Sequence, residues 1–276
     1  VSHVSSKVHK VWETIGLPVK DPYKYDETSE KIIKTNAESI RYIDLMGGEP
    51  FYMKEFRKLI DKLVDMGVSK NIMVTLSTNG THYNDTLIDK IVGNFENLGF
   101  NISLDGVGDK FDYLRHGDNW ESNVSGNLDK FYKLHTENDH VNINITHTVS
   151  VWNFFYLREF HLYFETHYPE FMIWNNTVHF PEWCEANVVP NTSKNLIIDK
   201  VCNPEKYGLP AWSKEKYDKD IKPLVEHTAT ESKEEHWQKF IEQVNAGDVY
   251  RKESFAETFS ELHDILKGDM VSIYGN

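Results

Sequence analysis

Several short groups of small and polar residues in this sequence have the composition of ligand-binding turns. The first group is Gly47, Gly48, Glu49 and Pro50. Two consecutive glycines let a backbone approach a ligand closely and expose its N–H and C=O groups. Glu49 adds a negative charge, and Pro50 fixes the direction of the chain where a helix begins. The same residue types also form ordinary turns, so this group alone leaves both interpretations open.

Two further groups of this kind follow later in the chain. One places small polar side chains before a glycine, and the other ends an apolar run with a serine and an aspartate. Because the serine and the aspartate are two positions apart in an extended segment, both side chains are expected on the same face. An ordinary turn or strand end remains the alternative for each group. The residues are Ser77, Thr78, Asn79 and Gly80 in one, and Ser103, Leu104, Asp105 and Gly106 in the other.

Strand and helix patterns alternate around these groups, with a repeat of about thirty residues, which is the size of a βαβ unit. Such alternation predicts an α/β fold with a parallel sheet covered by helices. Strands are predicted at residues 39–46, 71–77, 100–104, 141–149 and 171–174. Helices are predicted at residues 28–35, 54–66, 85–92, 123–135 and 153–166, and residues 1–25 are expected to form a short helix or loop.

Each polar group directly follows a predicted strand. In parallel α/β sheets the carboxyl ends of the strands meet at one rim, where ligands bind. Glu49, Asn79 and Asp105 are therefore expected on one rim, although they are far apart in sequence. Asn153 follows the predicted strand 141–149 and is a further candidate for the same rim.

The three groups, in this order and each at a strand end, resemble the radical S-adenosylmethionine (radical SAM) superfamily over residues 1–180. The resemblance implies that the first group holds the amino group of the methionine part of SAM through backbone oxygens and Glu49. It implies that Asn153 lies on the adenine side. The other residues that it assigns to the cofactor site are Gly47, Gly48, Pro50, Ser77, Thr78, Asn79, Ser103 and Asp105.

Arg115 extends this resemblance. Peptide-modifying members of the superfamily carry an arginine shortly after the third of these strands, which binds the carboxylate of the cofactor together with the strand's serine. Arg115 and Ser103 occupy the matching positions. The fork of an arginine guanidinium suits a carboxylate. A surface salt bridge is the alternative role for Arg115.

The resemblance also implies the architecture. Residues 1–180 would form a partial (β/α)6 TIM-like barrel of the radical SAM type, with its first strand missing from this chain. Residues 181–276 resemble the small α+β extension of the twitch/SPASM-like branch. A small hairpin is expected at residues 187–190 and 195–198, a connector at 203–222, and helices at 234–244 and 254–266.

The sequence lacks the Cys-x-x-x-Cys-x-x-Cys motif with which superfamily members hold a [4Fe–4S] cluster. That cluster reduces SAM to a 5'-deoxyadenosyl radical, which abstracts hydrogen. Residues 1–6 resemble the stretch that follows the motif, so the cysteine triad is expected upstream of Val1. No metal ligands are assigned within this chain. Cys184 and Cys202 are expected to be buried free thiols, because Cys184 and His179 alone are too few ligands for zinc.

The resemblance therefore implies the core of a radical SAM enzyme. Its substrate is unknown, although the twitch-like extension suggests a peptide or protein, and an electron donor such as a flavodoxin or ferredoxin would be a partner. One alternative is a non-catalytic peptide- or nucleotide-binding module on a degenerate radical SAM fold. Another is an ordinary α/β barrel enzyme that uses Glu49 and Asp105 as acid and base.

The composition limits the remaining classes. The 276 residues include 39% hydrophobic and 13% aromatic residues, enough for a sizeable core. The net charge of −13 disfavours nucleic acid as a partner, because phosphate binding needs clustered positive charge. No run approaches the ~20 apolar residues of a membrane span. Two cysteines and the lack of a signal segment indicate a reducing, cytoplasmic location.

Overall fold

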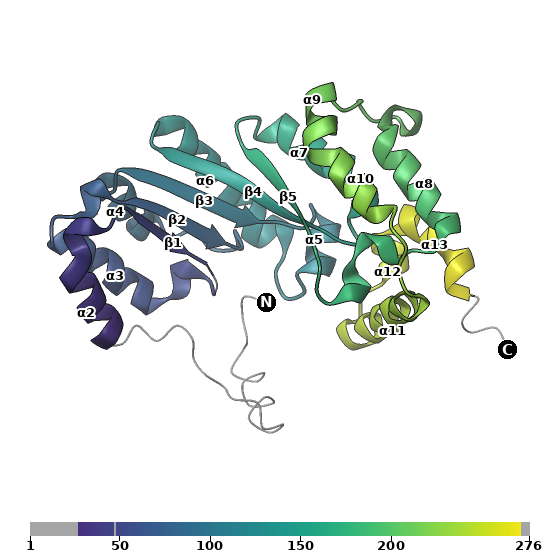
Figure 1. Cartoon of the computed structure of the whole chain (residues 1–276), viewed down its shortest axis with the longest axis horizontal. Coiled ribbons are helices and arrows are strands. Elements are labelled where there is room, and N and C mark those ends of the chain that lie inside the picture. The colour runs from purple at the N-terminus through teal and green to yellow at the C-terminus, as the bar shows by residue number, and fades with distance from the viewer. Residues whose placement is uncertain (1–26, 47, 272–276) are drawn as a thin grey trace, which may run out of the picture. The chain divides into compact units, whose positions relative to one another are not determined.

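A computed structural model describes residues 27–46 and 48–271 of the chain (Figure 1). The segment 1–25 and Gly47, for which the sequence makes predictions, lie outside the described residues. The described strands are β1 (Tyr42–Leu45), β2 (Met73–Thr78), β3 (Asn97–Ser103), β4 (Val141–Val149) and β5 (Met172–Thr177). They form one sheet in the order β1-β2-β3-β4-β5, and β2 pairs in parallel with both β1 and β3. The predicted α/β fold with a parallel sheet is confirmed.

A helix precedes or separates the strands as the sequence pattern predicts. The helices are α2 (Glu27–Asn36), α3 (Lys54–Asp65), α4 (Asp85–Asn94), α5 (Asp109–Leu114), α6 (Gly126–Glu137) and α7 (Leu157–His167). The π-helical turn η4 (Trp120–Ser125) leads into α6, and the 3-10 turn η5 (Phe154–Tyr156) leads into α7. Helix α3 buries Phe56, Ile60 and Leu63, whose spacing of three and four residues places them on one face.

The chain divides into two compact units. The first comprises the described residues of Val1–Ile102 together with Asn127–Asn144, and the second comprises Ser103–Gly126 together with the described residues of Ile145–Asn276. The domain boundary that the sequence suggests near Phe180 stays a prediction. Among the described helices, none has the length and apolar composition that a membrane span requires.

Alternation along the strands gives the first unit its core. Leu98, Phe100 and Ile102 of β3 are fully buried, because every second side chain of a strand points to the same face. The ring of Phe100 lies 5.5 Å from that of Phe131 on α6 and 6.5 Å from that of Phe51. The opposite face of β3 and β4 is polar, and Nδ2 of Asn144 donates to Oδ1 of Asn101 at 3.1 Å.

The second unit has a separate aromatic core. It is built from α11 (Glu234–Arg251), α12 (Phe255–Thr258) and α13 (Ser260–Val271), where helices are predicted at residues 234–244 and 254–266. Trp237 and Phe240 stack with their ring centroids 5.2 Å apart. Tyr113 of α5 packs on Phe259 at 5.2 Å, and its hydroxyl donates to Asp248 at 2.8 Å. These contacts fix the end of α5, where Arg115 follows.

The expected hairpin in the second unit is wrong. Residues 195–198 lie inside helix α8 (Asn191–Cys202). Residues 187–188 belong to the 3-10 turn η7 (Ala186–Val188), and residues 189–190 lead into α8 without strand structure. Ile197 and Val201, one helical turn apart, are buried together, so burial on one face overrides the strand-like run of apolar residues. No strand follows β5 in the described residues, so the β part of the expected α+β extension is wrong there.

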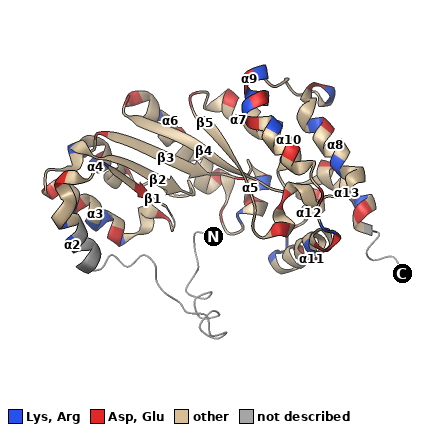
Figure 2. Ribbon diagram, in the orientation of Figure 1, with Lys and Arg blue, Asp and Glu red and all other residues tan. Residues whose placement is uncertain are grey.

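The expected connector at residues 203–222 is also more ordered than the sequence suggests. It contains the 3-10 turn η8 (Pro204–Tyr207), the short helix α9 (Lys214–Lys216) and the π-helical turn η9 (Tyr217–Ile221), before α10 (Lys222–Thr228) begins. Figure 2 shows basic and acidic residues intermixed on α8, α9 and α10. Such mixing explains why propensity alone indicates a polar linker.

Candidate functional site

The turn after β1 has the geometry that its glycine predicts. Gly48 adopts a φ of +61°, a left-handed conformation that favours glycine. A Cβ atom at this position would lie 3.2 Å from Sδ of Met53. Pro50 then begins the 3-10 turn η2 (Pro50–Tyr52). A side chain at position 48 would therefore be both strained and crowded.

Glu49 connects the turns after β1 and β2. Its side chain is buried, with an exposed fraction of 2%. Oε1 accepts a hydrogen bond from the hydroxyl of Thr78 at 2.9 Å, and Oε2 accepts one from the backbone N–H of Asn79 at 2.9 Å. The group after β1 and the group after β2 are thus joined directly. The carboxylate of Glu49 stabilises both turns.

The turn after β2 uses its own polar side chains. Oδ1 of Asn79 accepts hydrogen bonds from the backbone N–H of Thr81 at 3.0 Å and from its hydroxyl at 2.8 Å, which is an Asx turn. Gly80 has a φ of +75° and donates its N–H to Oγ1 of Thr78 at 3.2 Å. Ser77, the next candidate, is half-buried on β2. The structure therefore gives Thr78 and Asn79 a positioning role in this turn.

Glu49→Gln is expected to lower the free energy of unfolding by about 1–3 kcal/mol, because an amide has one acceptor oxygen in place of two and accepts hydrogen bonds more weakly than a carboxylate. Urea unfolding of the variant measures the change. Glu38→Gln, at an exposed position of the same unit, is the matched control. A Glu49→Gln protein as stable as its parent would show that the carboxylate does not hold the two turns together.

In the second unit, Asp105 and Arg115 form an ion pair. Nη2 of Arg115 lies 2.6 Å from Oδ2 of Asp105, and Oδ1 of Asp105 accepts the backbone N–H of Thr148 at 3.1 Å. Both side chains are partly exposed, at 26% for Arg115 and 20% for Asp105. The resemblance assigns both residues to the cofactor site, and the structure brings them into direct contact. Ser103, the serine assigned to the carboxylate, is half-buried at the end of β3.

One nitrogen of the Arg115 guanidinium has no hydrogen-bond acceptor among the described residues. Its Nε is buried and makes no hydrogen bond within the described part of the chain. A buried unpaired donor is costly, and a charged donor gains most from an anionic acceptor. The carboxylate of SAM is such an acceptor, so this side of Arg115 suits the group that the sequence resemblance assigns to it.

Asn153 connects the ends of β3 and β4. Its Nδ2 donates to the backbone oxygens of Asp105 and Thr148, both at 2.9 Å. Its Oδ1 accepts from the backbone N–H of Ser150 at 2.7 Å and from the Ser150 hydroxyl at 3.3 Å. These four contacts use the two donors and two lone pairs of the amide. Asn153 thus positions the rim, and its contact with adenine stays a prediction.

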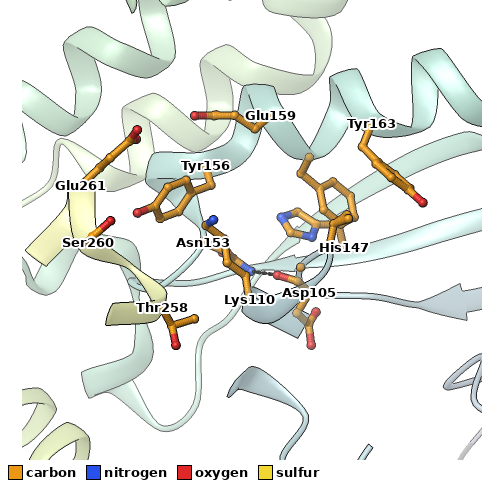
Figure 3. A pocket seen from close by; sticks show the side chains of 13 residues that line it. Asp105, Lys110, His147, Asn153, Tyr156, Glu159, Tyr163, Thr258, Ser260 and Glu261 are labelled. Carbon is orange, nitrogen blue, oxygen red and sulfur yellow. Dashed lines mark hydrogen bonds between the residues drawn. The ribbon is translucent and has the colours of Figure 1, made fainter. Parts of the chain in front are cut away.

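A cavity of about 380 Å³ opens beside Asp105 in the second unit (Figure 3). Lys110 lies on one wall, with its Nζ 4.3 Å from the centre of the Tyr156 ring. The sequence does not reveal this cavity, because segments more than a hundred residues apart contribute to it. Its lining residues are Asp105, Gly106, Val107, Lys110, His147, Asn153, Tyr156, Glu159, Phe160, Tyr163, Thr258, Ser260 and Glu261.

The second unit buries two histidines, one of which, His147, lines this cavity. His147 stacks on Phe160 with ring centroids 3.9 Å apart, and its Nδ1 lies 3.0 Å from the backbone oxygen of Leu104. His161 lies on α7, with Nε2 3.2 Å from Oδ1 of Asn175. Burial lowers the pKa of His147 and lowers that of His161 well below its usual value. Both imidazoles are therefore neutral in the folded protein at neutral pH.

The stability of the protein is expected to fall as the pH drops below about 6.5, where histidines of the unfolded chain bind protons that the folded chain does not. Each of the two histidines contributes a slope of up to about 1.4 kcal/mol per pH unit. His161→Gln should reduce this slope in urea unfolding measured between neutral and mildly acidic pH, whereas Thr166→Ala on the same helix should not. An unchanged slope in His161→Gln would contradict the assignment.

The comparison with protein families gives one match. The model of the radical SAM superfamily matches residues 11–148. This range contains the three strand-end groups and Arg115, whereas Asn153 lies outside it. No curated protein matches the chain.

Solved structures give distant likenesses. The structure of native anSMEcpe with bound AdoMet and Cp18Cys peptide is 18% identical, with a TM-score of 0.40, over 60% of this chain and 48% of that chain. Native anSMEcpe with bound AdoMet is 16% identical, with a TM-score of 0.42, over 72% of this chain and 56% of that chain. This chain thus spans about half the length of these proteins.

The family match covers half of the chain and includes the strand-end residues whose contacts are described above. The chain belongs to the radical SAM superfamily.

Proposed function

We propose that this chain binds SAM at its strand-end groups and acts in a radical SAM enzyme that abstracts hydrogen from a substrate. The observation that carries the proposal is the family match over residues 11–148, the segment that contains Glu49, Asp105 and Arg115. Membership of the superfamily indicates an enzyme. The unpaired Nε of Arg115 beside Asp105 supports the binding of a carboxylate there.

The assignment of each residue to a part of SAM follows the resemblance of the sequence. Arg115 would donate to the carboxylate, together with Ser103. The backbone of Gly48 and Glu49, with Gly47 before them, would accept from the amino group. Because Thr78 and Asn79 already use the carboxylate of Glu49, that side chain would act mainly by holding this backbone in place.

The residues of this sequence do not suit the iron–sulfur cluster. Three thiolates hold the cluster in the superfamily, and this sequence has two cysteines, Cys184 and Cys202. Both are free and half-buried. Burial raises the pKa of the Cys184 thiol to about 12, which disfavours the thiolate that a metal requires. The residues of this sequence therefore offer no ligand set for the cluster.

The remaining assignments follow from the resemblance of the sequence. We propose a peptide or protein as the substrate, a twitch-like role for residues 181–276, and a flavodoxin or ferredoxin as the electron donor. The cytoplasmic location stays a prediction. The radical chemistry would be supplied by SAM and the cluster, and this chain would orient SAM.

Binding of SAM tests this proposal. The full-length gene product that contains this chain is reconstituted with iron and sulfide without oxygen and dialysed against labelled SAM. One saturable site per chain, which adenosine alone fills less well than SAM, is the expected result. Absence of saturable binding, or equal competition by adenosine, would contradict a site that recognises the methionine part of SAM.

A further inference from the structure

Three side chains of the second unit that can bind metal ions meet beyond the end of β5. They are His179, Glu185 and His227, and the ligand atoms that they offer all lie within 4.8 Å of one another. His179 follows β5, Glu185 lies between the 3-10 turns η6 (Glu182–Cys184) and η7, and His227 lies in the last turn of α10. The fold therefore assembles the cluster from three separate segments.

The contacts within the cluster leave one nitrogen unsatisfied. Nε2 of His227 lies 3.1 Å from Oε2 of Glu185, yet it is buried and makes no hydrogen bond of normal geometry with the described residues. The ring of His179 stands perpendicular to that of His227, with 5.5 Å between the centroids. The side chains converge on one point without satisfying one another, which is the arrangement that a shared ion would complete.

The backbone around the cluster is held by hydrogen bonds. Nδ2 of Asn187, two residues after Glu185, donates to Oγ1 of Thr230 at 2.9 Å. That hydroxyl in turn donates to the backbone oxygen of His227 at 2.7 Å. The loop with Glu185 is thereby tied to the helix end with His227. Ligands on a fixed frame lose little entropy when an ion binds, which favours binding.

The burial of the three side chains gives the cluster a closed side and an open side. The side chains of Glu185 and His227 are exposed by 15% and 26%, whereas His179 is an exposed residue. An ion between them would have protein on one side and water on the other. Three protein ligands with an open position are the pattern of reactive zinc sites.

We propose that His179, Glu185 and His227 bind one divalent transition-metal ion, with Zn²⁺ as the reference ion. Two imidazoles and one carboxylate suit Zn²⁺ or Fe²⁺ and disfavour Mg²⁺ and Ca²⁺, which take oxygen ligands. On tetrahedral zinc the ligand atoms stand about 3.4 Å apart, so rotation of the exposed His179 would close the site. Cys184 is adjacent in sequence, but its thiol is not among the groups whose ligand atoms converge.

Metal titration of the chelator-treated protein tests the proposal in the absence of SAM, so the result does not depend on the proposed function. Calorimetry is expected to show one tight Zn²⁺ site per chain that Mg²⁺ does not fill. Co²⁺ in the same site should give the visible absorption bands of a four-coordinate ion. His179→Ala, Glu185→Gln and His227→Gln should each weaken Zn²⁺ binding by at least about tenfold.

Glu182→Gln and Cys184→Ser are the matched controls, because they flank Glu185 without belonging to the proposed ligand set. Both should bind Zn²⁺ like the parent. Urea unfolding of the metal-free variants identifies any that fail to fold. The Zn²⁺ affinities of the folded variants then decide whether the three residues are ligands. No stoichiometric binding, or unchanged binding in the folded ligand variants, would overturn the site. Loss of binding in Cys184→Ser would overturn the proposed ligand set.

Discussion

Arg115→Ala is expected to weaken the binding of SAM to the reconstituted protein by roughly thirtyfold to several thousandfold. This range corresponds to about 2–5 kcal/mol, the usual cost of truncating one partner of a charge pair in a binding site. The variant removes the unpaired Nε donor and leaves the carboxylate of Asp105 without its partner. In the proposed site, Asp105 would then repel the carboxylate of SAM.

Decarboxylated SAM provides the matched ligand control for this prediction. It lacks the group that Arg115 is proposed to bind, so its affinity should differ little between the parent and the variant. Arg41→Ala is the protein control, because Arg41 precedes β1 at the amino end of the sheet. Arg115→Lys should recover only part of the affinity, since an ammonium lacks the guanidinium fork. Equal losses for both ligands would show that Arg115 acts on stability and not on the carboxylate.

Lys200→Ala is expected to lower the free energy of unfolding by about 1–3 kcal/mol, because it removes a buried side chain and leaves the partly exposed carboxylate of Glu159 without its charged partner. The side chain of Lys200 is only 4% exposed and forms ion pairs with Glu159 and Glu261. Its Nζ also lies 3.7 Å from the centre of the Phe155 ring. Removing the ammonium would leave Glu159, whose Oε2 is already buried without a hydrogen bond, without its positive partner.

A double variant separates the charge from the packing. Lys200→Met with Glu159→Gln keeps most of the volume and removes both charges, so it should be more stable than Lys200→Met alone. Urea unfolding of the parent, both single variants and the double variant completes the cycle. Additive effects of the two substitutions would mean that the ion pair does not couple Lys200 to Glu159.

Much of the fold can be predicted from the sequence because it depends on local patterns. The strand predicted at residues 141–149 coincides with β4, since alternating Val141, Ile143 and Ile145 bury one face. The helix predicted at 54–66 matches α3, whose apolar residues repeat every three or four positions. The prediction of a hairpin at residues 187–190 and 195–198 is wrong, because a short apolar run does not distinguish a strand from a buried helix.

Fewer features of the candidate SAM site can be predicted from local sequence patterns. The sequence places Glu49, Asn79 and Asp105 at strand ends, but it cannot show that Glu49 binds Thr78 across 29 positions or that Arg115 pairs with Asp105. The four hydrogen bonds of Asn153 depend on the ends of two strands. The histidines that join Glu185 come from two other segments. Contacts of this kind arise from the tertiary fold and leave no periodic pattern.

Formation of 5'-deoxyadenosine tests the central claim most directly. The full-length gene product that contains this chain is reconstituted with iron and sulfide without oxygen, mixed with SAM and dithionite, and analysed by mass spectrometry. We expect 5'-deoxyadenosine to form, and to form far more slowly with Arg115→Ala than with the Arg41→Ala control at the same SAM concentration. A protein that binds no iron and forms no 5'-deoxyadenosine would contradict the account and indicate a binding module on the same fold.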